Sequence, residues 1–260
     1  MRKLLTSGAV AVGMLLASCT PANRVVENPL IGAANTMTLD FPKIELSDTA
    51  TVLHVDAYFR PHNCIRIDAG TYLLADGQKY MLQGSEGILP DSLFWMPDSG
   101  EASFVLKFGP LPRGTKSFDF IESDCDDCFK LYGVDLTGKK EYPRYPEGLP
   151  RALRKAPEDG PVPEPILAVG TTTVNVRLLG YRRGMVKEVA MYVNSLLNGQ
   201  EEHTAAIDPE SGTATLRFEQ YGTAMAYVSC GPVFGMCWIA PGETLDMYIA
   251  VSYTHLTLPT

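Results

Sequence analysis

After a short apolar run at its start the chain lacks any apolar run of membrane length, and it has fewer positive than negative charges. It has 22 Lys and Arg residues against 30 Asp and Glu residues, which gives a formal net charge of −8. Because nucleic acids are polyanions, this charge argues against nucleic acid as a partner. Helical periodicity is missing as well, since no segment keeps an apolar repeat of 3.6 residues. The low positive charge argues against a nucleic-acid-binding protein, and the lack of helical periodicity argues against a helical one.

Signatures of well-known catalytic sites are also missing. The sequence contains no G-x-S-x-G, no G-x-x-x-x-G-K-[ST] and no H-E-x-x-H. His54 and His203 lie far apart within apparent strands and lack the spacing of metal ligands, so we interpret them as structural. We accordingly expect no catalytic residue, no metal and no cofactor in this chain. Trp95 could serve as a ligand platform or could plug the end of a core.

The N-terminus carries an export signal. Arg2 and Lys3 precede an apolar run over residues 4–16, which is too short to cross a bilayer. The run ends in Leu-Ala-Ser-Cys at residues 16–19, which resembles the lipobox of bacterial lipoproteins. The resemblance implies that residues 1–18 are removed as a signal peptide and that Cys19 receives acyl chains. We therefore expect a cell-envelope protein whose membrane partner is reached through Cys19, in the outer membrane on its periplasmic or surface face.

The other cysteines are few. Of six cysteines, five remain after Cys19, which is an odd number in an oxidising compartment. Cys125 and Cys128 form a C-x-x-C pattern, but the carboxylates around them oppose the thiolate that redox catalysis needs. The sequence leaves two alternatives for this pair: a local disulfide, or two unreactive surface thiols. Cys230 and Cys237 flank a possible hairpin loop, which leaves either a cross-strand disulfide or two buried unpaired thiols.

Alternating apolar residues predict strands along most of the chain. The strongest signal is a hairpin over residues 71–82, because Asp76-Gly77 can adopt the positive φ angles of a tight type I′ turn. In the first half we expect strands at residues 37–41, 44–46, 52–59, 71–74, 79–82, 102–108, 117–121 and 129–136. In the second half we expect them at residues 172–179, 187–193, 202–207, 213–218, 224–230, 237–240 and 242–251.

A proline-rich stretch separates the two sets of strands. Residues 139–165 gather prolines and basic residues, with one helical turn expected at 149–155, and we interpret the stretch as a semi-rigid linker. The sequence thus predicts an all-β protein of two antiparallel, immunoglobulin-like β-sandwich domains, at residues 36–138 and 166–251. Residues 19–35 show no periodicity and are expected to form a flexible tether.

The C-terminal residues 252–260 resemble the translation of a sequencing-adapter read and not a natural protein segment. We expect the chain to be the product of a truncated gene. The alternative is that these residues form a genuine last strand.

The order of these parts resembles the long N-terminal extensions of TlpA-family thiol-disulfide oxidoreductases among Gram-negative envelope lipoproteins. The resemblance lies in the lipobox and in the segments at residues 75–80, 95–100, 108–112, 118–122 and 241–243. In that family the chemistry belongs to a C-terminal thioredoxin-like domain with Trp-Cys-x-x-Cys, and no stretch of this chain matches it. The resemblance implies no catalytic residue here.

Two functions are open on the sequence. The resemblance implies a non-catalytic spacer and docking region of a thiol-disulfide oxidoreductase, so that the chain is not itself an enzyme although its parent could be. The alternative is a self-contained surface lipoprotein that binds a glycan, a peptide or an envelope protein through aromatic side chains such as Trp95, Tyr142 and Tyr145.

Overall fold

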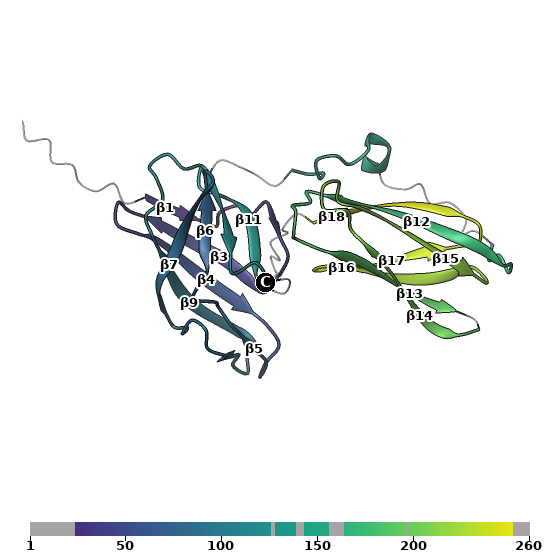
Figure 1. The fold of residues 1–260 in the computed structure, drawn as a ribbon, viewed down its shortest axis with the longest axis horizontal. Coiled ribbons are helices and arrows are strands. Elements are labelled where there is room, and N and C mark those ends of the chain that lie inside the picture. The colour runs from purple at the N-terminus through teal and green to yellow at the C-terminus, as the bar shows by residue number, and fades with distance from the viewer. Residues whose placement is uncertain (1–23, 126–127, 139–142, 156–163, 196, 252–260) are drawn as a thin grey trace, which may run out of the picture.

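The computed structural model describes residues 24–125, 128–138, 143–155, 164–195 and 197–251. The described residues form strands joined by turns, with one short 3-10 helix, and the predicted all-β class is confirmed. Cys19, Tyr142 and the C-terminal residues 252–260 lie outside the described residues. Two β-sandwiches follow one another along the long axis of the molecule (Figure 1).

The strands of the first sandwich are β1 (Arg24–Glu27), β2 (Ala33–Ala34), β3 (Leu39–Leu46), β4 (Thr51–Tyr58), β5 (Cys64–Ile65), β6 (Tyr72–Ala75), β7 (Gln78–Glu86), β8 (Phe94–Trp95), β9 (Glu101–Phe108), β10 (Ser117–Ile121) and β11 (Lys130–Asp135). Those of the second are β12 (Gly170–Leu179), β13 (Glu188–Ser195), β14 (Gly199–Ala206), β15 (Thr213–Gln220), β16 (Ala224–Cys230), β17 (Val233–Ile239) and β18 (Thr244–Ala250).

In the first sandwich β5 and β8 pair in a separate two-stranded sheet, and the other nine strands form one continuous sheet that folds over itself. Its strand order is β1-β3-β4-β9-β7-β6-β10-β11-β2. Strand β7 makes the fold possible, because its residues 78–81 pair with β6 and its later ones pair with β9, with a register shift between Leu82 and Gly84. A strand that changes partners in this way turns a corner between two layers. The core between the layers includes Phe41, Phe108 and Phe120, whose rings meet edge to face.

Local sequence signals account for the turns of this sandwich. Asp76 and Gly77 have φ angles of 49° and 77° between β6 and β7, so the predicted Asp-Gly hairpin is confirmed. Pro42 was expected to separate two strands, but β3 runs through it. The register of β3 and β4 shifts between Asp40 and Lys43, and such a bulge accommodates a proline that cannot donate to the ladder.

The flexible tether predicted for residues 19–35 is wrong for the described part. Strand β1 pairs with β3 and strand β2 pairs with β11, so this segment closes both ends of the folded sheet. Ile31, between the two strands, is fully buried. The segment is too short to show a period, yet its few apolar side chains suffice to pack it against the core.

The second sandwich has two sheets, β15-β12-β18 and β14-β13-β16-β17. Strands β12 and β18 run parallel, which corrects the expectation of purely antiparallel pairing. An immunoglobulin constant domain pairs its first strand with its second, whereas β12 here pairs with β15 and β18. The predicted immunoglobulin-like order is therefore not found among the described strands of this sandwich.

The two sandwiches share a buried contact. Ala33, Tyr72, Ile121 and Tyr132 of the first belong to the same apolar cluster as the core of the second. Burial raises the pKa of Tyr132 to about 12. In the predicted linker, residues 139–142 and 156–163 lie outside the described residues, and η1 (Arg151–Arg154) forms a single turn in the described part.

Candidate functional site

Cys125 and Cys128 are joined by a disulfide, with 5.3 Å between their Cα atoms. They lie in the connection from β10 to β11, residues 122–129, which we call the disulfide loop. The sequence left open either a local disulfide or two free surface thiols, and the structure contains the disulfide. The flanking elements are strands, so no helix N-terminus faces either sulfur among the described residues.

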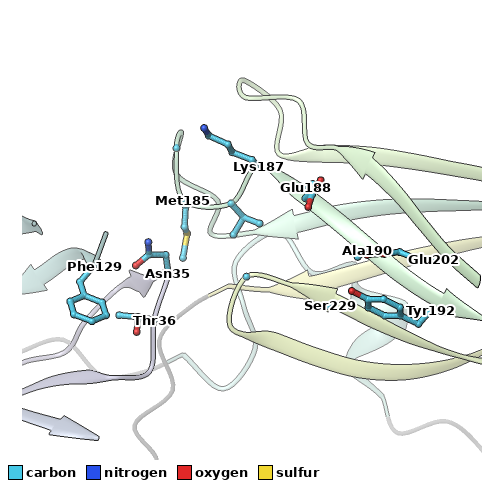
Figure 2. A pocket seen from close by; sticks show the side chains of 13 residues that line it. Asn35, Thr36, Phe129, Met185, Lys187, Glu188, Ala190, Tyr192, Glu202 and Ser229 are labelled. Carbon is cyan, nitrogen blue, oxygen red and sulfur yellow. The ribbon is translucent and has the colours of Figure 1, made fainter. Parts of the chain in front are cut away.

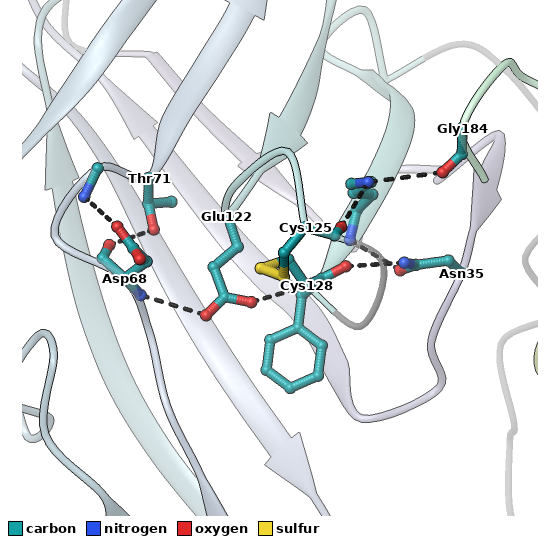
Figure 3. The surroundings of a disulfide bond; sticks show 10 residues. Asn35, Asp68, Thr71, Glu122, Cys125, Cys128 and Gly184 are labelled. Carbon is teal, nitrogen blue, oxygen red and sulfur yellow. Dashed lines mark hydrogen bonds between the residues drawn. A yellow bond between two sulfur atoms is a disulfide. The ribbon is translucent and has the colours of Figure 1, made fainter. Parts of the chain in front are cut away.

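Buried polar side chains fasten the disulfide loop (Figure 3). Asn35 Nδ2 donates to the carbonyl oxygen of Cys128 at 2.8 Å, and Asn35 Oδ1 accepts from the backbone N–H of Lys130 at 2.8 Å. The Nζ of Lys130, a residue that is 7% exposed, donates to the carbonyl oxygen of Cys125 at 2.9 Å. The same ammonium group lies 3.5 Å from the carbonyl oxygen of Gly184 in the second sandwich. Lys130 therefore links the loop to both sandwiches.

Glu122 supports the loop from within the protein. Its carboxylate accepts the backbone N–H of Asp68 at 3.2 Å and that of Phe129 at 2.8 Å. Burial raises the pKa of Glu122, and the two backbone donors oppose this shift. The carboxylate is thus engaged with the backbone. From the sequence, Glu122 was one of the carboxylates expected to oppose a thiolate at Cys125 or Cys128. In the structure its role is to hold the backbone.

A groove of about 700 Å³ lies beside the disulfide loop, between the two sandwiches (Figure 2). On one side it is lined by Asn35, Thr36 and Phe129. The other side is formed by the loop that precedes β13 and by the outer face of β13, β14 and β16. We call this space the inter-sandwich groove. Its residues were not singled out by the sequence, because they come from segments about 150 residues apart.

Carboxylates and a phenol dominate the chemistry of the inter-sandwich groove. Glu188, Glu202 and Tyr192 line it, together with the ammonium-bearing Lys187. The carboxylate of Glu202 accepts the Tyr192 hydroxyl, and this hydrogen bond raises the pKa of Tyr192. Ser229 is present as well, but the described lining contains neither His nor Cys to complete a Ser-His or Cys-His pair. Because Lys187 lines the groove beside the two carboxylates, the lining carries both signs of charge and is suited to holding a polar group.

The other three cysteines among the described residues are unpaired. Cys230 and Cys237 are free thiols, and burial raises the pKa of Cys230 to about 11 and also raises that of Cys237. The possible cross-strand disulfide is wrong because the turn takes only Gly231-Pro232. Cys230 then lies opposite Val233, and Cys237 lies opposite Ala226. Cys64 is also free.

The two histidines of the sequence analysis lie apart. His54 Nε2 is 2.9 Å from Glu45 Oε1 on the neighbouring strand. The ring of His203 stacks on Phe218 with 4.0 Å between the ring centroids. Its Nε2 atom is buried without a hydrogen-bond partner. No cluster of three or more His, Cys, Asp or Glu side chains able to bind a metal occurs in the described part of the chain.

The aromatic candidates differ in exposure. Trp95 is 62% exposed on β8, while its neighbour Met96 is buried, so Met96 closes the core and Trp95 points outward. The Tyr145 ring lies under the guanidinium groups of Arg144 and Arg154, at 5.5 and 5.9 Å. Tyr142 lies outside the described residues.

The sequence analysis missed an exposed row of apolar side chains. Strand β17 begins at Val233, within the segment interpreted as a hairpin loop, and presents Phe234, Met236 and Trp238 to solvent. We call these three the apolar edge row. Their spacing of two residues was a strand signal, but it was obscured because the residues between them are also apolar or small.

Comparison of the chain with protein-family models, curated proteins and solved structures finds no match. Among the described residues, no helix has the length and apolar character needed to cross a membrane.

We predict that Glu122→Ala lowers the free energy of unfolding by about 2 kcal/mol, since it removes a buried carboxylate and leaves two half-buried backbone N–H groups without their acceptor. Urea denaturation followed by circular dichroism measures the change. Glu101→Ala, at an exposed position on β9, serves as the control and should stay within about 0.5 kcal/mol of the parent. Equal effects of the two substitutions would contradict the structural role of Glu122.

We also predict that the protein loses stability as the pH falls below about 6.5, the ordinary pKa of histidine. Burial lowers the pKa of His203 in the folded protein, and the charge of Glu201 opposes this shift. Below pH 6.5 the unfolded chain therefore takes up a proton more readily than the folded one, so the stability present at higher pH is lost. His203→Gln should reduce the difference between pH 7.5 and 5.5 in urea denaturation. His62→Gln, whose side chain is exposed, should leave it unchanged.

Proposed function

We propose that this chain is a lipid-anchored, non-catalytic spacer and docking region of an envelope thiol-disulfide oxidoreductase related to the TlpA family. The observation that carries the non-catalytic part is the disulfide loop. Its C-x-x-C lies between two strands, and its backbone is bonded to Asn35, Glu122 and Lys130. A reactive pair needs a stabilised thiolate, whereas here Cys125 is exposed but the surrounding polar groups bond to the backbone of the loop.

The spacer part is supported by the shared core of the two sandwiches. The apolar cluster that includes Tyr72, Ile121 and Tyr132 continues into the second sandwich. Such a buried contact restricts the motion of one sandwich relative to the other. A pair of joined sandwiches is suited to holding a following domain away from a membrane surface. The free thiols of Cys230 and Cys237 have raised pKa values and are poor nucleophiles at neutral pH.

The test uses the full chain, reduced and then freed of reductant. We expect no acceleration of insulin reduction beyond that of the Cys125→Ser variant. Alkylation of Cys125 followed against pH should give an apparent pKa at or above about 8.5, the value of a free cysteine. A pKa well below that value, together with stoichiometric reduction of insulin as the dithiol is oxidised to the disulfide, would overturn the proposal.

The anchor is tested separately at Cys19. Expressed in a Gram-negative host, the parent chain should fractionate with membranes and carry acyl chains on residue 19, as seen by mass spectrometry of its N-terminus. Cys19→Ala should release the protein from the membrane fraction. An unmodified residue 19 in the parent would contradict lipidation.

A second candidate is a self-contained surface lipoprotein that binds a glycan or a peptide. The observation that favours it is the exposed indole of Trp95, next to a loop held by hydrogen bonds from His62 N to Met96 O and from Met96 N to Asn63 O. A flat aromatic ring on a held loop can stack on a sugar. The gene sequence beyond codon 251 separates the candidates: a Trp-Cys-x-x-Cys motif downstream supports the oxidoreductase, and a stop codon there supports the binding lipoprotein.

A further inference from the structure

Strand β17 is an edge strand without the usual protection. It ends the sheet β14-β13-β16-β17, so one side of its backbone has no partner strand among the described residues. Its sequence, Val-Phe-Gly-Met-Cys-Trp-Ile, contains no charged residue and no proline. Natural edge strands commonly carry charges, prolines or bulges, which prevent pairing with another chain. Strand β17 is therefore open to pairing.

The other edges of the second sandwich are charged. Strand β14 at the opposite edge of the same sheet carries Glu201 and Glu202. In the second sheet, β15 carries Arg217 and Glu219, and β18 carries Asp246. The comparison shows that the lack of charge is particular to β17 among these described edges.

Apolar side chains cover the outer face next to this edge. Phe234, Met236 and Trp238 are 66%, 66% and 67% exposed. Tyr227 on the neighbouring strand β16 stacks against Phe234, with 5.9 Å between the ring centroids. Met225 lies opposite Trp238 in the register of β16 and β17. The apolar edge row thus forms part of a larger exposed patch, a feature that marks interaction sites.

We propose that β17 pairs with β17 of a second copy of this chain, antiparallel, around a two-fold axis at Met236. This register places Met236 opposite Met236 and Phe234 opposite Trp238 on the outer face. On the inner face it places Gly235 opposite Cys237 and Val233 opposite Ile239. The strand is self-complementary around its centre, because each aromatic meets an aromatic, each small residue meets a small one, and the two β-branched ends meet each other.

Charge opposes a second copy less at this edge than at the other described edges of the second sandwich. Each chain has a formal net charge of −8, so two copies repel each other at long range. The uncharged strand β17 lets them meet without placing like charges in contact. Salt screens the long-range repulsion over about 10 Å at 0.1 M. Dimerisation by this route should consequently strengthen as ionic strength rises.

The area available indicates a weak dimer. A large aromatic side chain buries about 150–250 Å² when fully covered, so three side chains exposed by two thirds offer about 400 Å² on each copy. The total of about 800 Å², with the backbone bonds of the paired edges, falls below the roughly 1,200 Å² of a stable interface. A concentration-dependent equilibrium is expected. Two copies anchored in one membrane would meet at a higher effective concentration.

The first test is sedimentation velocity of the full chain carrying Cys19→Ala, which removes acylation as a cause of association. We expect a monomer–dimer equilibrium between about 5 and 500 μM, with more dimer at higher salt. Met236→Lys should weaken it more than tenfold, because two ammonium groups then oppose each other at the axis. The matched control is Thr204→Lys, which adds the same charge at an exposed position on the outer face of β14 and should change nothing.

The second test fixes the register. Met236→Cys places two thiols opposite each other at the axis, within the range that a disulfide needs. Oxidation by a diazene such as diamide should then form an intermolecular disulfide, as the two thiols give up two electrons and two protons to the diazene. Thr204→Cys in the same background should give no crosslinked dimer. If Met236→Lys fails to fold, the presence or absence of the Met236→Cys crosslink still tests the proposed dimer.

A chain that stays monomeric to 500 μM in every salt concentration overturns the proposal, and the apolar edge row then has another kind of partner. A dimer that is insensitive to Met236→Lys and is not crosslinked through Met236→Cys overturns it equally, since the two copies then meet elsewhere. The inference does not depend on the proposed function, because self-association is measured independently of lipidation and of thiol chemistry.

Discussion

The backbone between β10 and β11 leaves the sheet, and the polar groups at its buried and half-buried positions, among them Glu122, Cys128 and Phe129, must still be satisfied. The side chains of Glu122, Asn35 and Lys130 meet this requirement by bonding to the loop from three directions. Asn35 also holds the N-terminal segment in place, and Lys130 reaches Gly184 in the second sandwich. The N-terminal segment, the disulfide loop and the second sandwich are therefore linked by the same few hydrogen bonds, in addition to strand pairing and the shared apolar cluster.

This constraint explains why a C-x-x-C motif can have a structural role. A disulfide shortens the excursion of the loop, while the buried hydrogen bonds fix its backbone. In a redox centre the neighbouring groups stabilise a thiolate. The same residue pattern thus leads to different chemistry according to its place in the fold. Here it lies in a connection between two strands, whereas in a redox centre it lies at the start of a helix.

The alternation of apolar residues was enough to predict most strands of the chain. Asp76-Gly77 determined a hairpin because only a few residue types tolerate the positive φ angles of that turn. The N-terminal segment was harder to predict, since β1 and β2 are short and are stabilised by β3 and β11, which lie far along the chain. The buried positions of Glu122 and Lys130 were hidden for a related reason, because a charged residue is normally exposed.

The sequence by itself determined the all-β class, the hairpin at Asp76-Gly77 and the division into two sets of strands, because these follow from the local spacing of apolar and turn-forming residues. Tertiary structure alone decided which strands are edges and which cysteines meet. The short turn at Gly231-Pro232 places Cys230 opposite Val233, and the sheet order leaves β17 at an edge. Register and sheet order depend on contacts between residues distant in the chain, which local patterns do not encode.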